Sequence, residues 1–177
     1  LDLKTRKPLH HLNESPESAM SVTFLLNLYK ITKNEKYRHS ALKAMNAIVE
    51  NIVHKGQRED FETYWSCSRY GSDDLDGKKI ERNNQFKQNT LSMFWTAEAL
   101  LECFYLTDNR EYLNLGERTL DEMLMYQASW QPPYIYVRTV GGFAVMNADG
   151  EWNDSRQSLF SELIIRYGEE LKREEYL

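Results

Sequence analysis

The sequence predicts an all-α fold made of helical hairpins. The main support is an internal repeat, because residues 25–37 recur at 100–112 with a constant offset of 75 residues. Two leucines, a threonine, an asparagine and a tyrosine are identical in the two copies. A weaker third copy, residues 163–177, aligns Tyr176 with Tyr37 at an offset of 139. Each copy consists of an apolar helical stretch, a short polar turn and a tyrosine early in the next helix.

The first predicted hairpin consists of helices at about 16–32 and 35–55. Ser15, Pro16 and Glu17 form a typical helix start, with a capping hydroxyl, a proline at the first helical position and an acid near the positive end of the dipole. Apolar residues recur at three- and four-residue spacing in both segments, which predicts two amphipathic helices. The expected buried stripe of the first helix is Met20, Phe24, Leu25, Leu28 and Ile31.

Three further helices follow the same rules. Asn89 or Thr90 caps the third helix, the turn at 108–109 leads into the fourth, and Asp154 or Ser155 caps the fifth. The residues expected to face inward are Leu91, Phe94, Ala97, Leu101 and Phe104 in the third helix, Tyr112, Leu115, Leu120, Met123 and Leu124 in the fourth, and Leu159, Phe160, Leu163, Ile164 and Tyr167 in the fifth.

Two long connections separate the hairpins, at residues 57–88 and 128–153. Each joins the end of one hairpin to the start of the next, so we expect both on the same side of the helix array. Long aromatic-rich connections are typical of functional loops. In the second connection, the β-prone run 134–140, two glycines and residues 143–146 predict one small β-hairpin. We expect residues 1–177 to form a single domain.

The charge balance argues against two classes of partner. Lys and Arg number 22 and Asp and Glu number 27, which leaves a net charge of −5 and no excess of basic residues for binding a nucleic acid backbone. No apolar run reaches the roughly 20 residues that cross a bilayer, and no signal peptide is visible in the residues given.

The two cysteines form neither a disulfide framework nor a zinc motif, and Cys103 is expected in the core.

Hairpins of this length, with turns of the Leu-x-x-Tyr-x-Ile-Thr-x-Asn-x-x-Tyr type and long loops on one side, resemble the α/α-toroid enzymes. That superfamily includes the six-hairpin glycosidases and related polysaccharide lyases. Residues 141–157 resemble a sugar-facing loop that runs into an inner helix. The resemblance implies an (α/α) toroid, of which this chain supplies about half, and a carbohydrate ligand.

The last residues of the sequence begin a third hairpin but do not include its second helix. Tyr37 and Tyr112 each begin a second hairpin helix of several turns, whereas the sequence given stops one residue after Tyr176. A hairpin without its second helix leaves an apolar stripe uncovered. We therefore expect a fragment or partial toroid, whose open edge is covered by the remainder of the same chain or by a second copy in a homodimer.

The candidate catalytic residues are acids in the two long connections. Glycoside hydrolysis uses two carboxyl groups that flank the scissile bond. Asp149 and Glu151 lie beside a tryptophan in the second connection, and Asp73 and Asp74 are adjacent in the first. Two alternatives stay open: residues 149–150 form a turn, and the acids of the first connection form a solvated loop or bind a hard cation such as calcium.

Aromatic rings stack on sugar faces, and arginines hold the carboxylates of uronic acids. The candidate substrate-binding residues are Trp65, Tyr70, Trp130, Arg138, Trp152 and Arg156. The alternatives are that the tryptophans pack beneath loops and that Arg138 lies on the polar face of an edge strand. No cofactor is expected, and no metal site is expected either, since the pair His10 and His11 has no partner at metal-ligand spacing.

Taken together, these residues predict a glycoside hydrolase that acts on an oligosaccharide or uronide through a carboxylate pair on the loop face. A polysaccharide lyase is an alternative, and it requires a tyrosine or histidine base with an arginine that neutralises the substrate carboxylate. Tyr70 and Arg138 are the candidates for those roles. A non-enzymatic helical scaffold that binds a protein or peptide is a further alternative.

Overall fold

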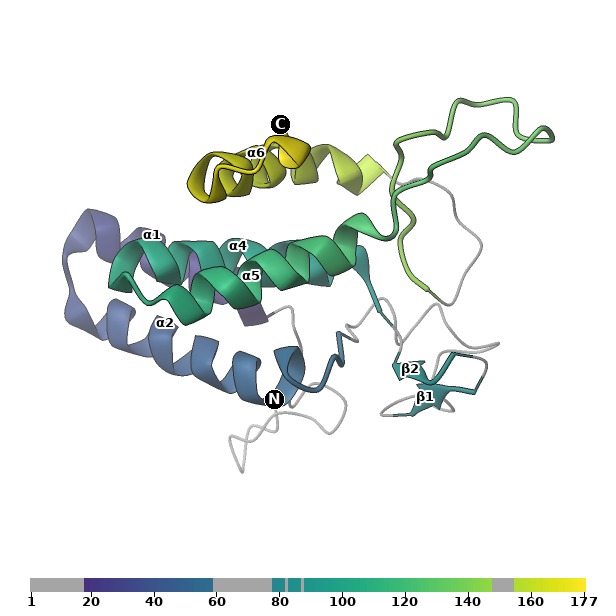
Figure 1. The fold of residues 1–177 in the computed structure, drawn as a ribbon. Helices are drawn as coiled ribbons and strands as arrows, with labels where there is room; N and C mark the ends of the chain where they lie inside the picture. The colour runs from purple at the N-terminus through teal and green to yellow at the C-terminus, as the bar shows by residue number, and fades with distance from the viewer. Residues whose placement is uncertain (1–17, 59–77, 82, 87, 148–154) are drawn as a thin grey trace.

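The computed structural model describes residues 18–58, 78–81, 83–86, 88–147 and 155–177 (Figure 1). Within these ranges the fold is mostly helical, and the all-α prediction is confirmed. The α-helices are α1 (Ser18–Thr32), α2 (Glu35–Ile48), α4 (Thr90–Thr107), α5 (Arg110–Leu124) and α6 (Phe160–Leu171). A π-helical turn, Val49–Val53, extends α2, and 3-10 turns lie at Ser155–Leu159 and Glu174–Tyr176.

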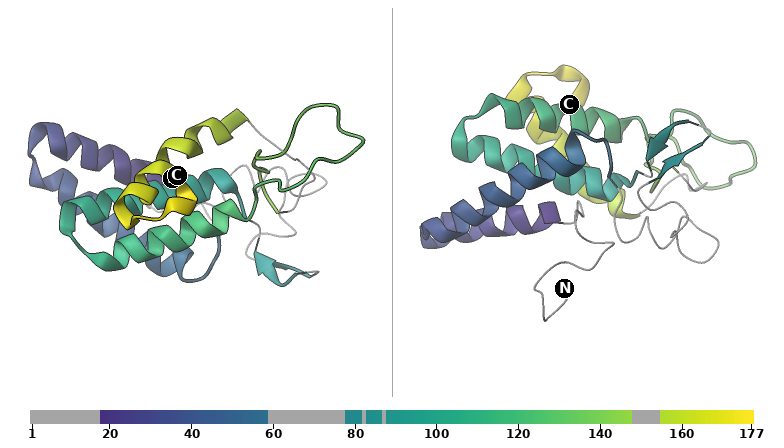
Figure 2. Two further views of the ribbon diagram at one scale, coloured as in Figure 1. Left: turned by 45° about the horizontal axis from the view of Figure 1, so that its top comes forward. Right: turned by 90° about the horizontal axis from the view of Figure 1, so that it is seen from below.

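Helix α4 is the centre of the array. It packs against α5, its partner in the second hairpin, and against α1, α2 and α6. Figure 1 shows α6 above the α4–α5 hairpin and α2 below it, and Figure 2 shows the same helices from two further directions. Both faces of α4 are therefore covered, which explains why most of its side chains from Thr90 to Phe104 are buried. No closed ring of helices is evident in the part of the chain that the structure describes.

The turns inside the first two hairpins are built alike, as the sequence repeat predicts. The hydroxyls of Thr32 and Thr107 each donate to the carbonyl four residues earlier, at 2.7 Å. The side-chain oxygens of Asn34 and Asn109 each accept from the N–H two residues later, at 3.0 Å, and so cap the following helix. The residue between threonine and asparagine has a φ of +56° in both turns.

The weak third copy shares this backbone geometry. Lys172 also has a φ of +56°, and the Tyr176 N–H donates to the Arg173 carbonyl at 3.2 Å, as the Tyr37 N–H does to the Asn34 carbonyl at 3.0 Å. The copies differ in that Arg173 replaces the capping asparagine. The repeat therefore extends to all three hairpin turns, although the third lacks the side-chain cap.

The predicted inner stripe of the first helix is wrong at three of its five positions, whereas Leu25 packs against the core and Leu28 is partly buried. Met20, Phe24 and Ile31 are each more than half exposed, and α1 instead buries Ala19, Val22 and Leu26. This helix carries apolar residues around most of its circumference, so periodicity alone did not identify the buried face. Leu159 of the fifth predicted helix was also expected to face inward, but it is half exposed.

The predicted β-hairpin over residues 134–146 is also wrong. Residues 134–140 form a loop whose backbone groups bond to one side chain: the Gln131 Nε2 donates to the carbonyls of Ile135 (2.9 Å) and Val137 (3.1 Å), and its Oε1 accepts from the Thr139 N–H (2.8 Å). These bonds replace a strand ladder. The β-hairpin of the described chain lies in the first connection.

That hairpin consists of two short antiparallel strands, β1 (Lys79–Ile80) and β2 (Gln85–Phe86). Lys79 is opposite Phe86, and Ile80 is opposite Gln85. Asn84, with a φ of +55°, completes the turn, in keeping with the tolerance of asparagine for the left-handed region.

The core lies between the two hairpins and α6. It includes Cys103, which confirms the expectation from the sequence, and burial raises the pKa of its thiol to about 12. An ion-pair cluster joins three helices at the edge of this core, because Glu102 of α4 binds both Lys30 of α1 and Arg166 of α6. No helix of the described residues is long and apolar enough to cross a membrane.

Candidate functional site

The two long connections meet at one end of the helix array. Arg58, at the start of the first connection, forms a parallel backbone bridge with Gln88 at its end. The Gln88 N–H donates to Oδ1 of Asn147 in the second connection (2.9 Å), and the Asn147 N–H donates back to the Gln88 carbonyl (3.3 Å). The Asn147 Nδ2 also donates to the Phe86 carbonyl of β2 (3.0 Å). The described parts of both connections therefore lie on the same side of the array, as predicted.

The first turn of α4 fixes the second connection in place. The Thr90 N–H donates to the Val145 carbonyl at 2.9 Å, and the Thr90 hydroxyl donates to the Ala144 carbonyl at 2.9 Å. Of the two predicted caps, Asn89 is the one observed, since its Oδ1 accepts from the Leu91 N–H at 2.9 Å. The start of α4 thus acts as the scaffold on which both connections are held.

A cavity of about 440 Å³ opens where the connections meet. Its wall carries the amide side chains of Gln85, Gln88 and Asn147 together with the rings of Phe86 and Tyr126. Amides supply both donors and acceptors, and rings supply flat apolar surface, so the wall suits a polar, ring-shaped ligand. The cavity lies within the usual size range of small-molecule sites.

Glu122 is the acidic residue of the cavity wall among the described residues, and arginines neutralise it. The fully buried Arg58 binds this carboxylate, with its Nε at 3.1 Å, and also donates to the Thr119 hydroxyl at 3.2 Å. Arg118 binds the other oxygen of Glu122 at 3.1 Å. Burial lowers the pKa of the Arg58 guanidinium, and the Glu122 charge opposes that shift.

Among the described residues, the remaining charges of the wall are positive. Lys55 and Lys79 both line the cavity, and the Lys79 ammonium lies 5.4 Å from the centre of the Phe86 ring. Lys55 has an interaction partner of its own and arginines bind Glu122, so Lys79 is the cation that the described wall offers to a ligand. The Lys79 charge favours a ligand that carries a negative charge.

Several buried polar atoms beside the cavity have no hydrogen-bond partner among the described residues. They are Nη1 of Arg58, Oε1 of Gln88 and Nδ2 of Asn89. Leaving such atoms unpaired costs free energy, and in native folds a water or ion often pairs with them. Of these three residues, Gln88 is the one that lines the cavity.

Tyr126 is the hydroxyl-bearing ring of the wall. Burial raises its pKa above the usual value, and the nearby Glu122 adds to the shift. The phenol therefore stays protonated at neutral pH, where it donates or accepts hydrogen bonds and does not act as a base.

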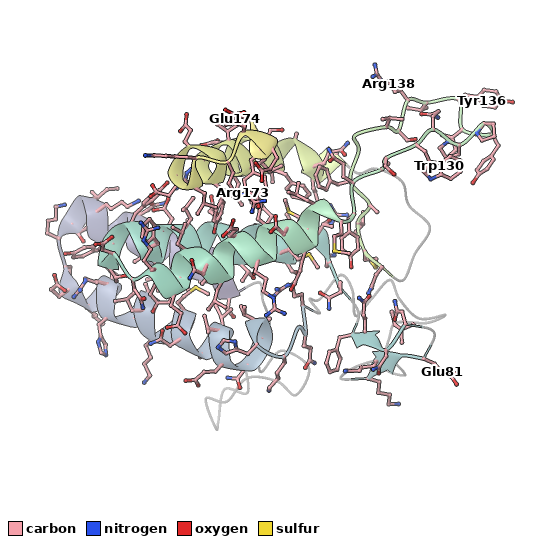
Figure 3. All side chains as sticks on the ribbon, in the orientation of Figure 1. Glu81, Trp130, Tyr136, Arg138, Arg173 and Glu174 are labelled. Carbon is pink, nitrogen blue, oxygen red and sulfur yellow. The ribbon has the colours of Figure 1, made fainter. Side chains whose placement is uncertain are left out.

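The structure describes three of the residues predicted for the site, and it does not bring Trp130 and Arg138 together. Figure 3 shows Trp130 and Arg138 pointing to opposite sides of the loop that follows α5. Arg138 is exposed, Trp130 is half exposed, and Arg156 lies half buried in the 3-10 turn before α6. The other predicted site residues lie outside the described residues: Trp65, Tyr70, Asp73, Asp74, Asp149, Glu151 and Trp152.

The cavity residues themselves were not predicted. Gln88 precedes a recognised helix cap, and this position was the one local hint that polar side chains gather there. Nothing in the sequence pattern marks Arg58, and Asn147 was included only as part of the loop 141–157, because their roles depend on partners 64 and 59 residues away. Within the described chain, no three His, Cys, Asp or Glu side chains lie close enough together to hold a metal ion.

Comparisons of this chain with protein-family models, with curated proteins and with solved structures find no match.

Proposed function

We propose that this protein is a carbohydrate-active protein, a glycoside hydrolase that binds an oligosaccharide or uronide in the cavity at the start of α4. The observation that carries the proposal is where the two acid-bearing segments are attached. Asp73 and Asp74 belong to a segment flanked by Arg58 and Lys79, and Asp149 follows Asn147 by two residues. Lys79 and Asn147 line the cavity, and Arg58 is bridged to Gln88 of its wall.

The chemistry of the wall supports a sugar ligand. Sugar hydroxyls both donate and accept hydrogen bonds, and the amides of Gln85, Gln88 and Asn147 match them in both senses. The Phe86 ring offers a surface on which a sugar face stacks. In the proposed reaction, one carboxyl group protonates the glycosidic oxygen and the second acts as nucleophile or as base toward water. One comes from Asp73 or Asp74, the other from Asp149 or Glu151.

We also propose that these helices are part of an (α/α) toroid, and the way in which the hairpins pack supports this. The first helices of successive hairpins are neighbours, since α4 packs against both α1 and α6, while α2 and α5 are the second helices. The connections that carry the candidate acids enter α4 and α6 at their N-terminal ends. The proposed toroid has α1, α4 and α6 in its inner layer, with the N-terminal ends of α4 and α6 at the site.

The test is turnover of a carbohydrate panel by wild type and by single variants. We expect release of reducing ends from at least one acidic or neutral oligosaccharide, and a loss of about 100-fold or more in Asp149→Asn or Glu151→Gln and in Asp73→Asn or Asp74→Asn. Glu81→Gln, at the exposed turn after β1, is the matched control. Wild-type activity in all four acid variants would contradict the proposal.

A polysaccharide lyase is the second candidate, favoured by the cationic Lys79 at the cavity wall. The same panel separates the two reactions, because a lyase product carries a double bond that absorbs in the ultraviolet and a hydrolase product does not.

A further inference from the structure

Residues 128–141 form a closed loop that projects beyond the helices, and we name it the aromatic arm (Figure 1). Two backbone hydrogen bonds close its base: the Ala128 N–H donates to the Gly142 carbonyl, and the Gly141 N–H donates to the Ala128 carbonyl, both at 2.8 Å. The arm begins two residues after Tyr126, which lines the cavity. Its base therefore borders the proposed site.

One side chain organises the arm from inside. Gln131 donates through Nε2 to the carbonyls of Ile135 and Val137 and accepts through Oε1 from the N–H and the hydroxyl of Thr139. These bonds satisfy backbone groups that a flexible loop would leave to water. The arm thus has a defined shape without a strand ladder, which lowers the entropy cost of binding a ligand to it.

The arm presents rings to solvent. Tyr136 at its tip is fully exposed, Tyr134 is 67% exposed and Val137 is 69% exposed, and Figure 3 shows Tyr136 and Trp130 on this loop. Large apolar groups gathered on an ordered surface loop are typical of a binding surface. The segment contains no acidic residue and one arginine, Arg138, in a chain with a net charge of −5.

We propose that the aromatic arm binds the part of a polysaccharide chain that extends beyond the cavity. This inference rests on the proposed carbohydrate ligand and adds that the substrate is a polymer. Tyrosines combine a flat ring for a sugar face with a hydroxyl for its polar edge, and the absence of acids admits an anionic chain, which Arg138 attracts. A cavity of about 440 Å³ holds a small-molecule-sized portion of such a chain, so a polymer also contacts the adjoining surface.

The test compares a polymer with its short fragment. The probes are polygalacturonate and trigalacturonate, with xylan and xylotriose as neutral counterparts, and affinity is measured by calorimetry. The variant is Tyr134→Ala/Tyr136→Ala, and Phe24→Ala, an exposed ring on α1, is the control. We expect the double variant to bind at least one polymer about tenfold more weakly and the trisaccharide as tightly as wild type does.

A second variant tests the shape of the arm. Gln131→Ala keeps every ring but removes the organising hydrogen bonds, and it is expected to weaken polymer binding severalfold with the trisaccharide again unaffected. Unchanged polymer affinity in both variants would overturn the proposal. A second result would also overturn it: wild type is a dimer, the double variant is a monomer, and both bind the polymer with the same affinity. The arm would then bind a second copy of the chain and not a polysaccharide.

The outcome also separates this inference from the proposed function. Arm-dependent polymer binding without turnover supports the arm and contradicts the hydrolase. If wild type hydrolyses a trisaccharide and the arm variants bind the polymer as tightly as wild type does, the hydrolase is supported and the arm proposal is contradicted. Absence of binding to all four probes overturns the arm proposal.

Discussion

Gln88 and Asn147, which are 59 residues apart in the sequence, are joined by a reciprocal pair of hydrogen bonds. The Asn147 side chain accepts from the Gln88 N–H at 2.9 Å, and the Asn147 N–H donates to the Gln88 carbonyl at 3.3 Å. Because Gln88 also bridges Arg58, one short contact region ties together both long connections and the first turn of α4. This junction forms the cavity wall.

Removing the Asn147 side chain tests the junction. Asn147→Ala deletes the acceptor for Gln88 and the donor for Phe86 at a half-buried position, so we expect unfolding free energy to fall by about 1–3 kcal/mol. Asn83→Ala, which removes two side-chain hydrogen bonds to Gln85 in an exposed turn, is the control and should cost within about 0.5 kcal/mol. Urea denaturation gives both values, and equal losses would show that the junction adds nothing.

Local features of the fold could be predicted from the sequence, because they depend on residues a few positions apart. The hairpin turns follow from a threonine, an asparagine and a tyrosine at fixed spacing. Asn89 was recognised as one of two candidate caps because its partners are two and three residues away. The buried face of α1 was missed because several faces of that helix are apolar. The hairpin over 134–146 was misplaced because Gln131 satisfies the backbone there.

Long-range pairing explains what was missed at the site. The wall depends on Arg58 finding Glu122 and on Gln88 finding Asn147, and no local pattern encodes either pair. The predicted acids lie outside the described residues, so their roles stay predictions. Trp130 and Arg138 were predicted as one substrate-binding group, whereas the structure places them on opposite sides of the aromatic arm (Figure 3).

A close approach between α5 and α6 gives a second prediction. A Cβ atom at Gly116 would lie 1.9 Å from the Tyr167 hydroxyl oxygen, and that buried hydroxyl donates to the Ala97 carbonyl at 2.7 Å. Gly116→Ala should therefore cost about 2 kcal/mol or more, although alanine normally favours a helix. Tyr167→Phe should cost about 1 kcal/mol through the lost hydrogen bond.

The double variant decides whether the clash is the cause. Removing the hydroxyl makes room for the new methyl group, so Gly116→Ala/Tyr167→Phe should be more stable than the sum of the single effects predicts. Strictly additive losses in thermal denaturation would mean that Gly116 is required for another reason.

Glu98 and Glu102, one turn apart on α4, should respond in opposite ways to the same substitution. At Glu102 burial raises the pKa, but hydrogen bonds from Lys30 and Arg166 outweigh it and the net pKa is lowered. At Glu98 burial raises the pKa, and the Arg166 charge opposes it only in part. At pH 7 we expect Glu102→Gln to destabilise the fold by about 1–3 kcal/mol and Glu98→Gln to leave it unchanged or more stable.

The pH dependence provides the check. A lowered pKa contributes stability above the unfolded-state value of about 4.3, and that contribution is lost as the pH falls through the folded-state pKa. Wild type should therefore lose more stability on acidification than Glu102→Gln does. The raised pKa of Glu98 acts in the other direction, since its contribution is lost as the pH rises. Identical pH profiles for wild type and both variants would exclude this account.

Removing one partner of the Arg58–Glu122 ion pair should strongly lower the stability of the fold. Glu122→Ala leaves a fully buried guanidinium without its carboxylate, with an expected loss of about 3–5 kcal/mol. Arg118→Ala removes an exposed partner of the same carboxylate and should cost less than about 1 kcal/mol. Denaturation of both variants tests the contrast, and a similar loss in each would mean that burial does not govern this pair.

The central claim is that the cavity at the start of α4 binds a sugar, and its most direct test is an NMR titration. Trigalacturonate, and in a second titration xylotriose, is added to protein labelled with nitrogen-15. The side-chain amide signals of Gln85, Gln88 and Asn147 are followed, and the Gln88 signal is assigned by its absence from the spectrum of Gln88→Ala. We expect saturable shifts of these amides with at least one of the two sugars. Saturable binding that shifts only residues of the α1–α2 hairpin, or no shift at any concentration for either acidic or neutral trisaccharides, would contradict it.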